Sequence, residues 1–180
     1  MRRLSLTMLF LTLVCVPAAL AGGTAVGDGA LSVINASGVI TVAGKGTIYG
    51  QIDKGTIAVT DPDSTDGPPM VVVGAEHISH SSGSHLTTYW GKDITFRGVS
   101  GRYKIVVSAA TGVDFLAVGV GKAWLKADAT LGPVGTYTVD GAKMQPLPVA
   151  PAAALPAGTT WAGLVVPFGV QPTATTTTSP

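Results

Sequence analysis

Apolar and polar residues alternate one by one along much of this chain, instead of recurring at helical spacing. The clearest stretch is 102–108, in which Tyr103, Ile105 and Val107 are separated by charged or less apolar neighbours. Successive side chains of a strand point to opposite faces, so the pattern predicts a half-buried strand with these three residues facing inward. The residues expected to face water on the same strand are Arg102, Lys104 and Ser108.

Similar short runs recur between turn-forming residues such as Gly, Asp and Pro, and β-branched residues dominate them. They predict strands near 31–34, 38–43, 46–52, 55–60, 70–75, 85–90, 93–99, 102–108, 113–120, 122–127 and 135–140. Closely spaced short strands are typical of sandwiches and barrels. The predicted fold class is therefore all-β, an antiparallel β-sandwich or closed Greek-key barrel of about 8–11 short strands.

A β-solenoid is the alternative fold, because glycines divide the segment 38–60 into short, similar pieces. A solenoid needs a steady repeat length so that equivalent side chains stack. The isoleucines at positions 40, 48, 52 and 57 are separated by 8, 4 and 5 positions, which disfavours a regular repeat.

The first residues have the pattern of a secretory signal peptide. Two arginines follow Met1, an apolar run extends over 4–16, and the small-x-small sequence 19–21 ends the segment. We expect residues 1–21 to be removed, leaving an all-β domain over 22–144 that is secreted or held in the cell envelope.

Composition changes after the domain. Residues 145–180 contain seven prolines, with Ala and Thr between them, and carry no charge. Such a segment favours extended or disordered chain, so we expect a C-terminal spacer. Its apolar stretch 161–170 is too short to cross a membrane, so no transmembrane span is expected in the processed chain.

Charge and cysteine content exclude several kinds of partner. Loss of Arg2 and Arg3 leaves nine basic residues against ten acidic ones, a net charge of −1. A nucleic-acid-binding domain usually carries a basic footprint, so no nucleic-acid partner is expected. Cys15 is the only cysteine and lies in the leader, which excludes disulfides in the processed chain.

The three histidines form the first candidate site. His77, His80 and His85 lie within nine positions, and Glu76 precedes the first. Imidazole and carboxylate are suitable ligands for Zn²⁺, so the cluster is a candidate metal site or simply a polar loop. On a strand, His77 and His80 would point to opposite faces, which would separate them.

Three aspartates form the second candidate site. Asp61, Asp63 and Asp66 precede Gly67, and converging carboxylates are the ligands that Ca²⁺ prefers. The spacing misses the EF-hand pattern by one residue, and the position of its bidentate glutamate is taken by Val72. A solvated acidic loop is the alternative.

Tyr89 and Trp90 follow the histidines in the sequence. An exposed tryptophan can stack on a sugar or anchor a partner, whereas a buried one is part of the core. Both interpretations stay open from the sequence.

These observations favour a non-enzymatic secreted or envelope module that binds or assembles through its β surface with an extracellular or envelope partner. No cofactor is expected, with Zn²⁺ or Ca²⁺ as the alternatives. Two other functions remain: a metal-dependent extracellular hydrolase that uses the histidine cluster, and a small-ligand carrier.

Overall fold

The computed structural model describes residues 28–63, 65–81, 83–150 and 161–169. The predicted signal peptide over 1–21 lies outside these residues. Within them the regular structure is entirely β, which confirms the all-β class. The strands are β1 (Gly29–Thr60), β2 (Val71–Ser81), β3 (Leu86–Gly98), β4 (Arg102–Ala127), β5 (Thr136–Val139), β6 (Gln145–Pro146) and β7 (Leu164–Phe168).

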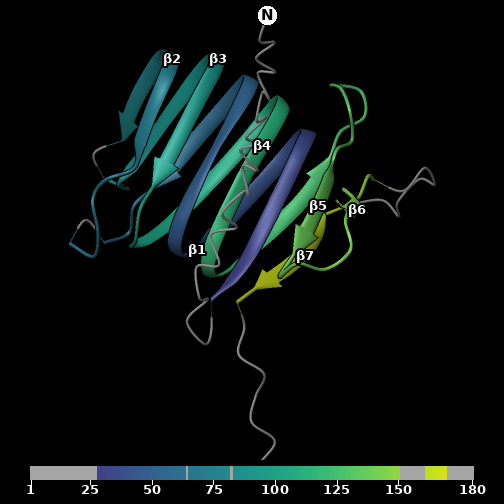
Figure 1. Cartoon of the computed structure of the whole chain (residues 1–180). Coiled ribbons are helices and arrows are strands. Elements are labelled where there is room, and N and C mark those ends of the chain that lie inside the picture. Colours follow the sequence, from purple (N-terminus) through teal and green to yellow (C-terminus); the bar gives the residue numbers. More distant parts are fainter. Residues whose placement is uncertain (1–27, 64, 82, 151–160, 170–180) are drawn as a thin grey trace, which may run out of the picture.

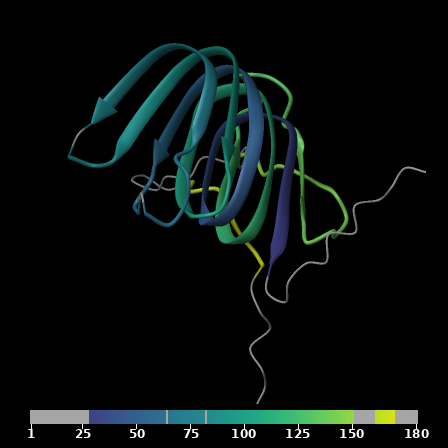
Figure 2. The same cartoon turned by 60° about the vertical axis from the view of Figure 1, so that its left-hand side comes forward.

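All seven strands belong to one antiparallel sheet with the order β2-β3-β1-β4-β7, and β5 joins β1 to β6. β1 and β4 contain 32 and 26 residues, far more than a usual strand of about six. Figures 1 and 2 show these long strands curving strongly, so that each passes from one side of the molecule to the other.

The pairing of β1 with β4 shows how this curvature arises. Val42 and Val59 are 17 positions apart in β1, and both pair with Ile105 of β4. The pair Val59–Ile105 joins the two arms of a long hairpin, and the pair Val42–Ile105 joins neighbouring turns. One arm consists of β1 followed by β2, and the other of β3 followed by β4. Together the two arms form a ribbon that winds around its own core. We call this arrangement the coiled ribbon.

Glycines allow the long strands to bend without ending. Gly46 of β1 and Gly119 of β4 pair with each other and have φ angles of 140° and 139°. A side chain at Gly46 would overlap the carbonyl oxygen of Val118, and one at Gly119 would overlap that of Lys45. Only glycine fits this close approach of two paired backbones. The sequence predicted separate strands over 38–43 and 46–52 and over 113–120 and 122–127, and the structure has one continuous bent strand in each place.

The core fills the inside of the coiled ribbon. Alternate residues point inward, and successive turns place them side by side, as with Ile40, Val107 and Ile57 in one row. The prediction for 102–108 is confirmed, since Tyr103, Ile105 and Val107 are buried while Arg102 and Lys104 are exposed.

The start of the coil is covered by strands from the C-terminal part of the chain. β5 pairs with the beginning of β1 and β7 with the end of β4. Leu147, Val166 and Phe168 are buried there. The sequence predicted a disordered spacer over 145–180, so β6 and β7 correct that expectation for the described residues. Burial of these three apolar side chains outweighs the low strand propensity of the surrounding prolines. The other parts of the predicted spacer, 151–160 and 170–180, lie outside the described residues.

Among the strands that the structure describes, the sheet does not close, because β2 and β7 are the two ends of its pairing order. The predicted sandwich or closed barrel of many short strands is therefore not confirmed beyond the all-β class. Among the described residues, no helix has the length and apolar character needed to cross a membrane.

Candidate ligand-binding groove

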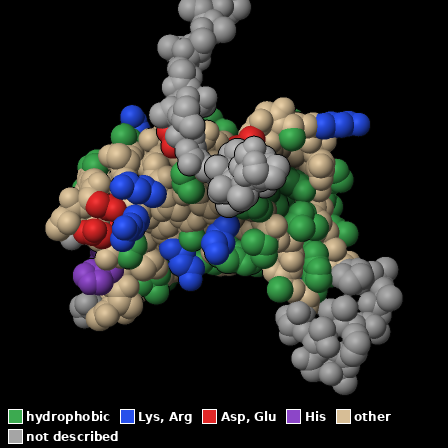
Figure 3. All heavy atoms as spheres, turned by 90° about the horizontal axis from the view of Figure 1, so that it is seen from below, with side chains coloured by type: hydrophobic (Ala, Val, Ile, Leu, Met, Phe, Trp, Pro, Cys, Tyr) green, Lys and Arg blue, Asp and Glu red, His purple; other side chains and the backbone are tan. Residues whose placement is uncertain are grey.

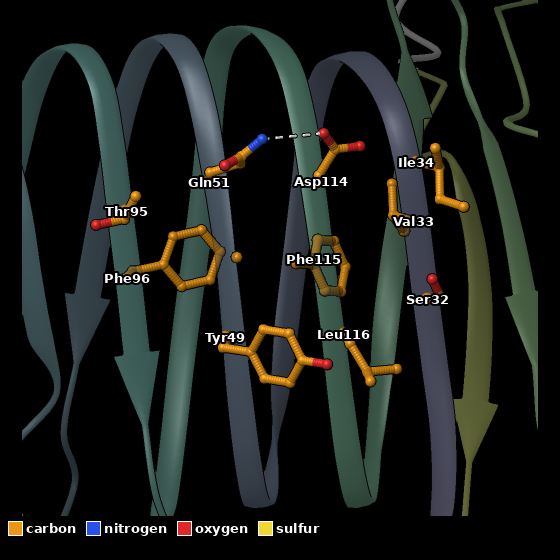
Figure 4. Close-up of a pocket in the computed structure, with 11 residues that line it drawn as sticks. Ser32, Val33, Ile34, Tyr49, Gln51, Thr95, Phe96, Asp114, Phe115 and Leu116 are labelled. Carbon is orange, nitrogen blue, oxygen red and sulfur yellow. Dashed lines mark hydrogen bonds between the residues drawn. The ribbon is translucent and has the colours of Figure 1, made fainter. Parts of the chain in front are cut away.

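Four neighbouring strand passes form a groove of about 670 Å³ on the surface of the coiled ribbon (Figure 4). From one side of the groove to the other, the strand passes follow the order β3, second turn of β1, β4 and first turn of β1. The lining residues are Ser32, Val33, Ile34, Tyr49, Gly50, Gln51, Thr95, Phe96, Asp114, Phe115 and Leu116.

The coil itself brings the two β1 segments together. Ser32 and Tyr49 are 17 positions apart, and both pair with Leu116. The same offset relates Val33 to Gly50, which both pair with Phe115. One full turn of the ribbon therefore separates the two segments along the chain and leaves them on either side of β4.

The floor of the groove is tightly packed. Gly50 lies between Phe96 and Phe115, and both rings are buried. A side chain at Gly50 would come within 2.7 Å of the Phe96 ring and 2.5 Å of the Phe115 Cβ. The two rings thus occupy the space that a side chain at Gly50 would take, and they pack on the core face of the sheet, beneath Tyr49 and Gln51.

A hydrogen-bonded pair lies on one side of the groove. The Gln51 side-chain amide donates to Oδ2 of Asp114 at 3.4 Å, as the dashed line in Figure 4 marks. Oδ1 of Asp114 accepts the backbone N–H of Asn35 at 2.6 Å. Asn35 has a φ of 49°, so the carboxylate also supports a left-handed residue at an irregularity in β1. Asp114 is thereby fixed in place, and Gln51 keeps hydrogen-bonding capacity for a ligand.

Apolar side chains lie on both sides. Tyr49 is 50% exposed, with half-buried Leu116 beside it, on the side away from Gln51. Ile34 is 44% exposed and lies on the same side as Asp114 (Figure 4). In Figure 4 the Tyr49 hydroxyl points toward Leu116. Exposed apolar groups beside a fixed polar pair can hold a ring or alkyl group at one end and a neutral hydrogen-bonding group at the other.

Sequence reasoning did not identify this groove. Its residues come from three strands, and no local motif joins them. The one signal in the sequence is the offset of 17 positions between 32–34 and 49–51, which has meaning only once β4 is known to lie between them.

The structure places the predicted histidine cluster at the end of the coil. His77 lies beside Trp90, with ring centroids 6.1 Å apart, and His80 Nδ1 lies 3.1 Å from the Thr87 hydroxyl. His85 follows the β2–β3 turn with a φ of 49°. Within the described chain, no three His, Cys, Asp or Glu side chains are grouped so as to hold a metal ion, so Glu76 and the imidazoles gain no support as a Zn²⁺ site. Metal binding there stays a prediction.

The carboxylates of the predicted calcium loop accept hydrogen bonds from the chain itself. Asp61 accepts the backbone N–H of Asp63, and Asp66 accepts the backbone N–H of Arg102 at 3.0 Å. Asp63 accepts both the hydroxyl and the N–H of Thr65, and these hydrogen bonds lower the pKa of Asp63. Asp61 and Asp63 therefore stabilise the local turn, while Asp66 joins the loop to the start of β4. Ca²⁺ binding also stays a prediction.

The two predicted aromatic residues lie on opposite faces of β3. Tyr89 is half-buried and packs against the core, whereas Trp90 is 37% exposed beside His77. Trp90 thus keeps the surface position that a stacking role requires.

Comparison of this chain with protein-family models, with curated proteins and with solved structures finds no match. Any functional assignment therefore depends on the geometry of the chain itself.

Proposed function

We propose that this chain is an exported, non-enzymatic binding module, in which the coiled ribbon is a β-solenoid-like scaffold for the groove. The observation that carries the proposal is the combination of exposed Tyr49 with the Gln51–Asp114 pair over a tightly packed floor. A rigid sheet favours binding because little conformational entropy is lost when a ligand immobilises residues that are already ordered.

The chemistry of the groove defines the kind of ligand. Tyr49, Leu116 and Ile34 suit a ring or alkyl group, and Gln51 suits a neutral amide or hydroxyl. The ligand is therefore a small molecule, or a segment of a larger partner, with an apolar part next to an uncharged hydrogen-bonding part. A small-ligand carrier would use the same groove, and the two roles differ in whether the ligand is attached to a larger partner.

The leader sequence supports a location outside the cytoplasm, in the secreted fraction or the cell envelope. The alternative of a metal-dependent hydrolase is less favoured, since the predicted histidines do not line the groove.

NMR titration with benzamide tests the binding role. Benzamide combines a ring with a neutral amide, and acetamide is the control that lacks the ring. We expect benzamide to shift the amide signals of Tyr49, Gln51 and Leu116 with a Kd of roughly 10 mM, a usual strength for so few atoms. Acetamide should leave those signals unchanged.

A matched pair of variants locates the binding. Tyr49→Ser should abolish the shifts, whereas Val120→Ser removes a side chain of similar exposure, 45%, outside the groove and should preserve them. Equal shifts in both variants, or shifts spread evenly over the surface, would exclude the groove as the binding site.

A further inference from the structure

A group of four exposed cations lies away from the groove. Its members are Lys45, Arg102, Lys104 and Lys122, which we call the basic patch. Figure 3 shows several Lys and Arg side chains on the face seen from below, close to a smaller group of acidic ones. The near-neutral net charge of the chain conceals this local concentration.

The register of the sheet places the four side chains together. Ala43 pairs with Lys104 on one side and with Lys122 on the other, so the two lysines are two strand spacings apart, roughly 10 Å. Lys45 pairs with Arg102 two positions further along the same strands. Residues two apart on a strand share a face, so all four cations point away from the core.

An aromatic ring extends the basic patch. Trp124 lies two positions from Lys122 on β4 and is half-buried, and the Lys122 Nζ lies 5.9 Å from the centroid of its ring. A cation over an aromatic face is held in a preferred place. The edge and remaining surface of the ring offer a platform for a flat apolar group such as the face of a sugar.

Two acidic residues lie near Arg102, at one end of the patch. The charges of Arg102 and Lys45 help to lower the pKa of Asp63, after the larger effect of the hydrogen bonds from Thr65. Asp66 also holds the backbone N–H of Arg102.

We propose that the basic patch with Trp124 binds an acidic polysaccharide. Cations roughly 10 Å apart cannot converge on one small anion, but they can contact successive charges of a polymer. The tryptophan favours a chain of sugar rings over a polymer without them. This inference is independent of the groove, because none of the five residues lines it.

Retention on immobilised polygalacturonate tests the proposal, with neutral dextran as the control polymer. We expect the wild-type chain to be retained on polygalacturonate at low salt, to elute as salt is raised, and to pass through dextran unretarded. The double variant K104Q/K122Q should bind polygalacturonate about tenfold more weakly, because it removes two of the four charges. Trp124→Ala should weaken binding without changing its salt dependence.

The chain supplies a matched control for total charge. Lys54 and Lys92 are exposed and pair with each other across β1 and β3, so K54Q/K92Q changes the net charge by the same amount elsewhere. This control should bind like the wild type. Equal weakening in both double variants would overturn the proposal, as would retention on dextran. Tighter binding of a twenty-nucleotide oligothymidylate than of polygalacturonate would also overturn the proposal, and would indicate a nucleic acid as the partner of the basic patch. Far-ultraviolet circular dichroism of each variant confirms that the fold is kept.

Discussion

Ile40 and Ile57 lie in the same row of the core, although 17 positions separate them in β1, because both pair with Val107 of β4. Each is almost completely buried, with an exposed fraction of 1% or less. The contact between these two turns is what makes a single winding ribbon enclose a core. The following predictions test this arrangement and the residues that allow it.

Truncation of Ile57 should destabilise the protein strongly. Ile57→Ala removes a fully buried side chain between two turns, and we expect the free energy of unfolding to fall by about 2–5 kcal/mol. Val39→Ala is the control, because Val39 is 38% exposed on the same strand, and it should change stability by less than about 0.5 kcal/mol. Urea denaturation of both variants measures the difference. Equal effects would show that Ile57 is not in the core.

Substitution of Gly46, at a bend of β1, should also destabilise the protein. Gly46→Ala places a methyl group against the Val118 carbonyl oxygen at a φ of 140°, which side chains rarely adopt. We expect a loss of more than about 2 kcal/mol, since strain and overlap add. Gly83→Ala is the control, because no atom lies within 4 Å of an added methyl there. A thermal melt that ranks the two variants in the opposite order would contradict the close approach of the two paired backbones at Gly46.

Tyr103 should make stability fall at high pH. Its hydroxyl is buried without a hydrogen-bond partner among the described residues, and burial raises the pKa of Tyr103 to about 12. The unfolded chain ionises near pH 10, before the folded one does, so stability is complete below pH 10 and declines up to about pH 12. The loss due to this residue is about 2–3 kcal/mol at pH 12.

Tyr103→Phe isolates this effect from the other ionising groups. The variant should be about as stable as the wild type at pH 8, or up to about 1 kcal/mol more stable, because it removes an unsatisfied hydroxyl. Its advantage over the wild type should grow steadily between pH 10 and 12. A constant difference across that range would mean that the hydroxyl is solvated in the folded protein.

Removal of the leader should leave a protein with one defined amino-terminal residue. The small-x-small sequence 19–21 predicts cleavage after Ala21. Amino-terminal sequencing of the exported protein should therefore begin at Gly22. Recovery of a chain that begins at Met1 in the cytoplasmic fraction would contradict export.

The sequence predicted the strands far better than their arrangement. Alternation correctly placed Tyr103, Ile105 and Val107 in the core, because the period of two is a local property. Breaks between strands were predicted at 44–45 and at 121, since glycine usually marks a turn. The strands instead continue and bend there, and Gly46 and Gly119 let the two paired backbones approach closely, which depends on a partner strand far away in the sequence.

The repeat length of 17 positions is also not evident from the sequence. Successive isoleucines of 38–60 are irregularly spaced, whereas the structural repeat relates Ile40 to Ile57 and Leu31 to Ile48. Each turn of β1 alternates with a turn of the returning arm, so no single segment carries the full pattern. The groove and the basic patch depend on this alternation and were therefore beyond local motifs.

Nuclear Overhauser contacts of Val107 test the coiled ribbon most directly. In an antiparallel sheet, backbone protons of paired residues lie close enough to give strong cross-peaks. The account predicts cross-peaks from the Val107 backbone to both Ile40 and Ile57, which only two successive turns of β1 on either side of β4 can produce. Cross-peaks to one isoleucine alone, with the other paired elsewhere, would contradict the winding of the ribbon.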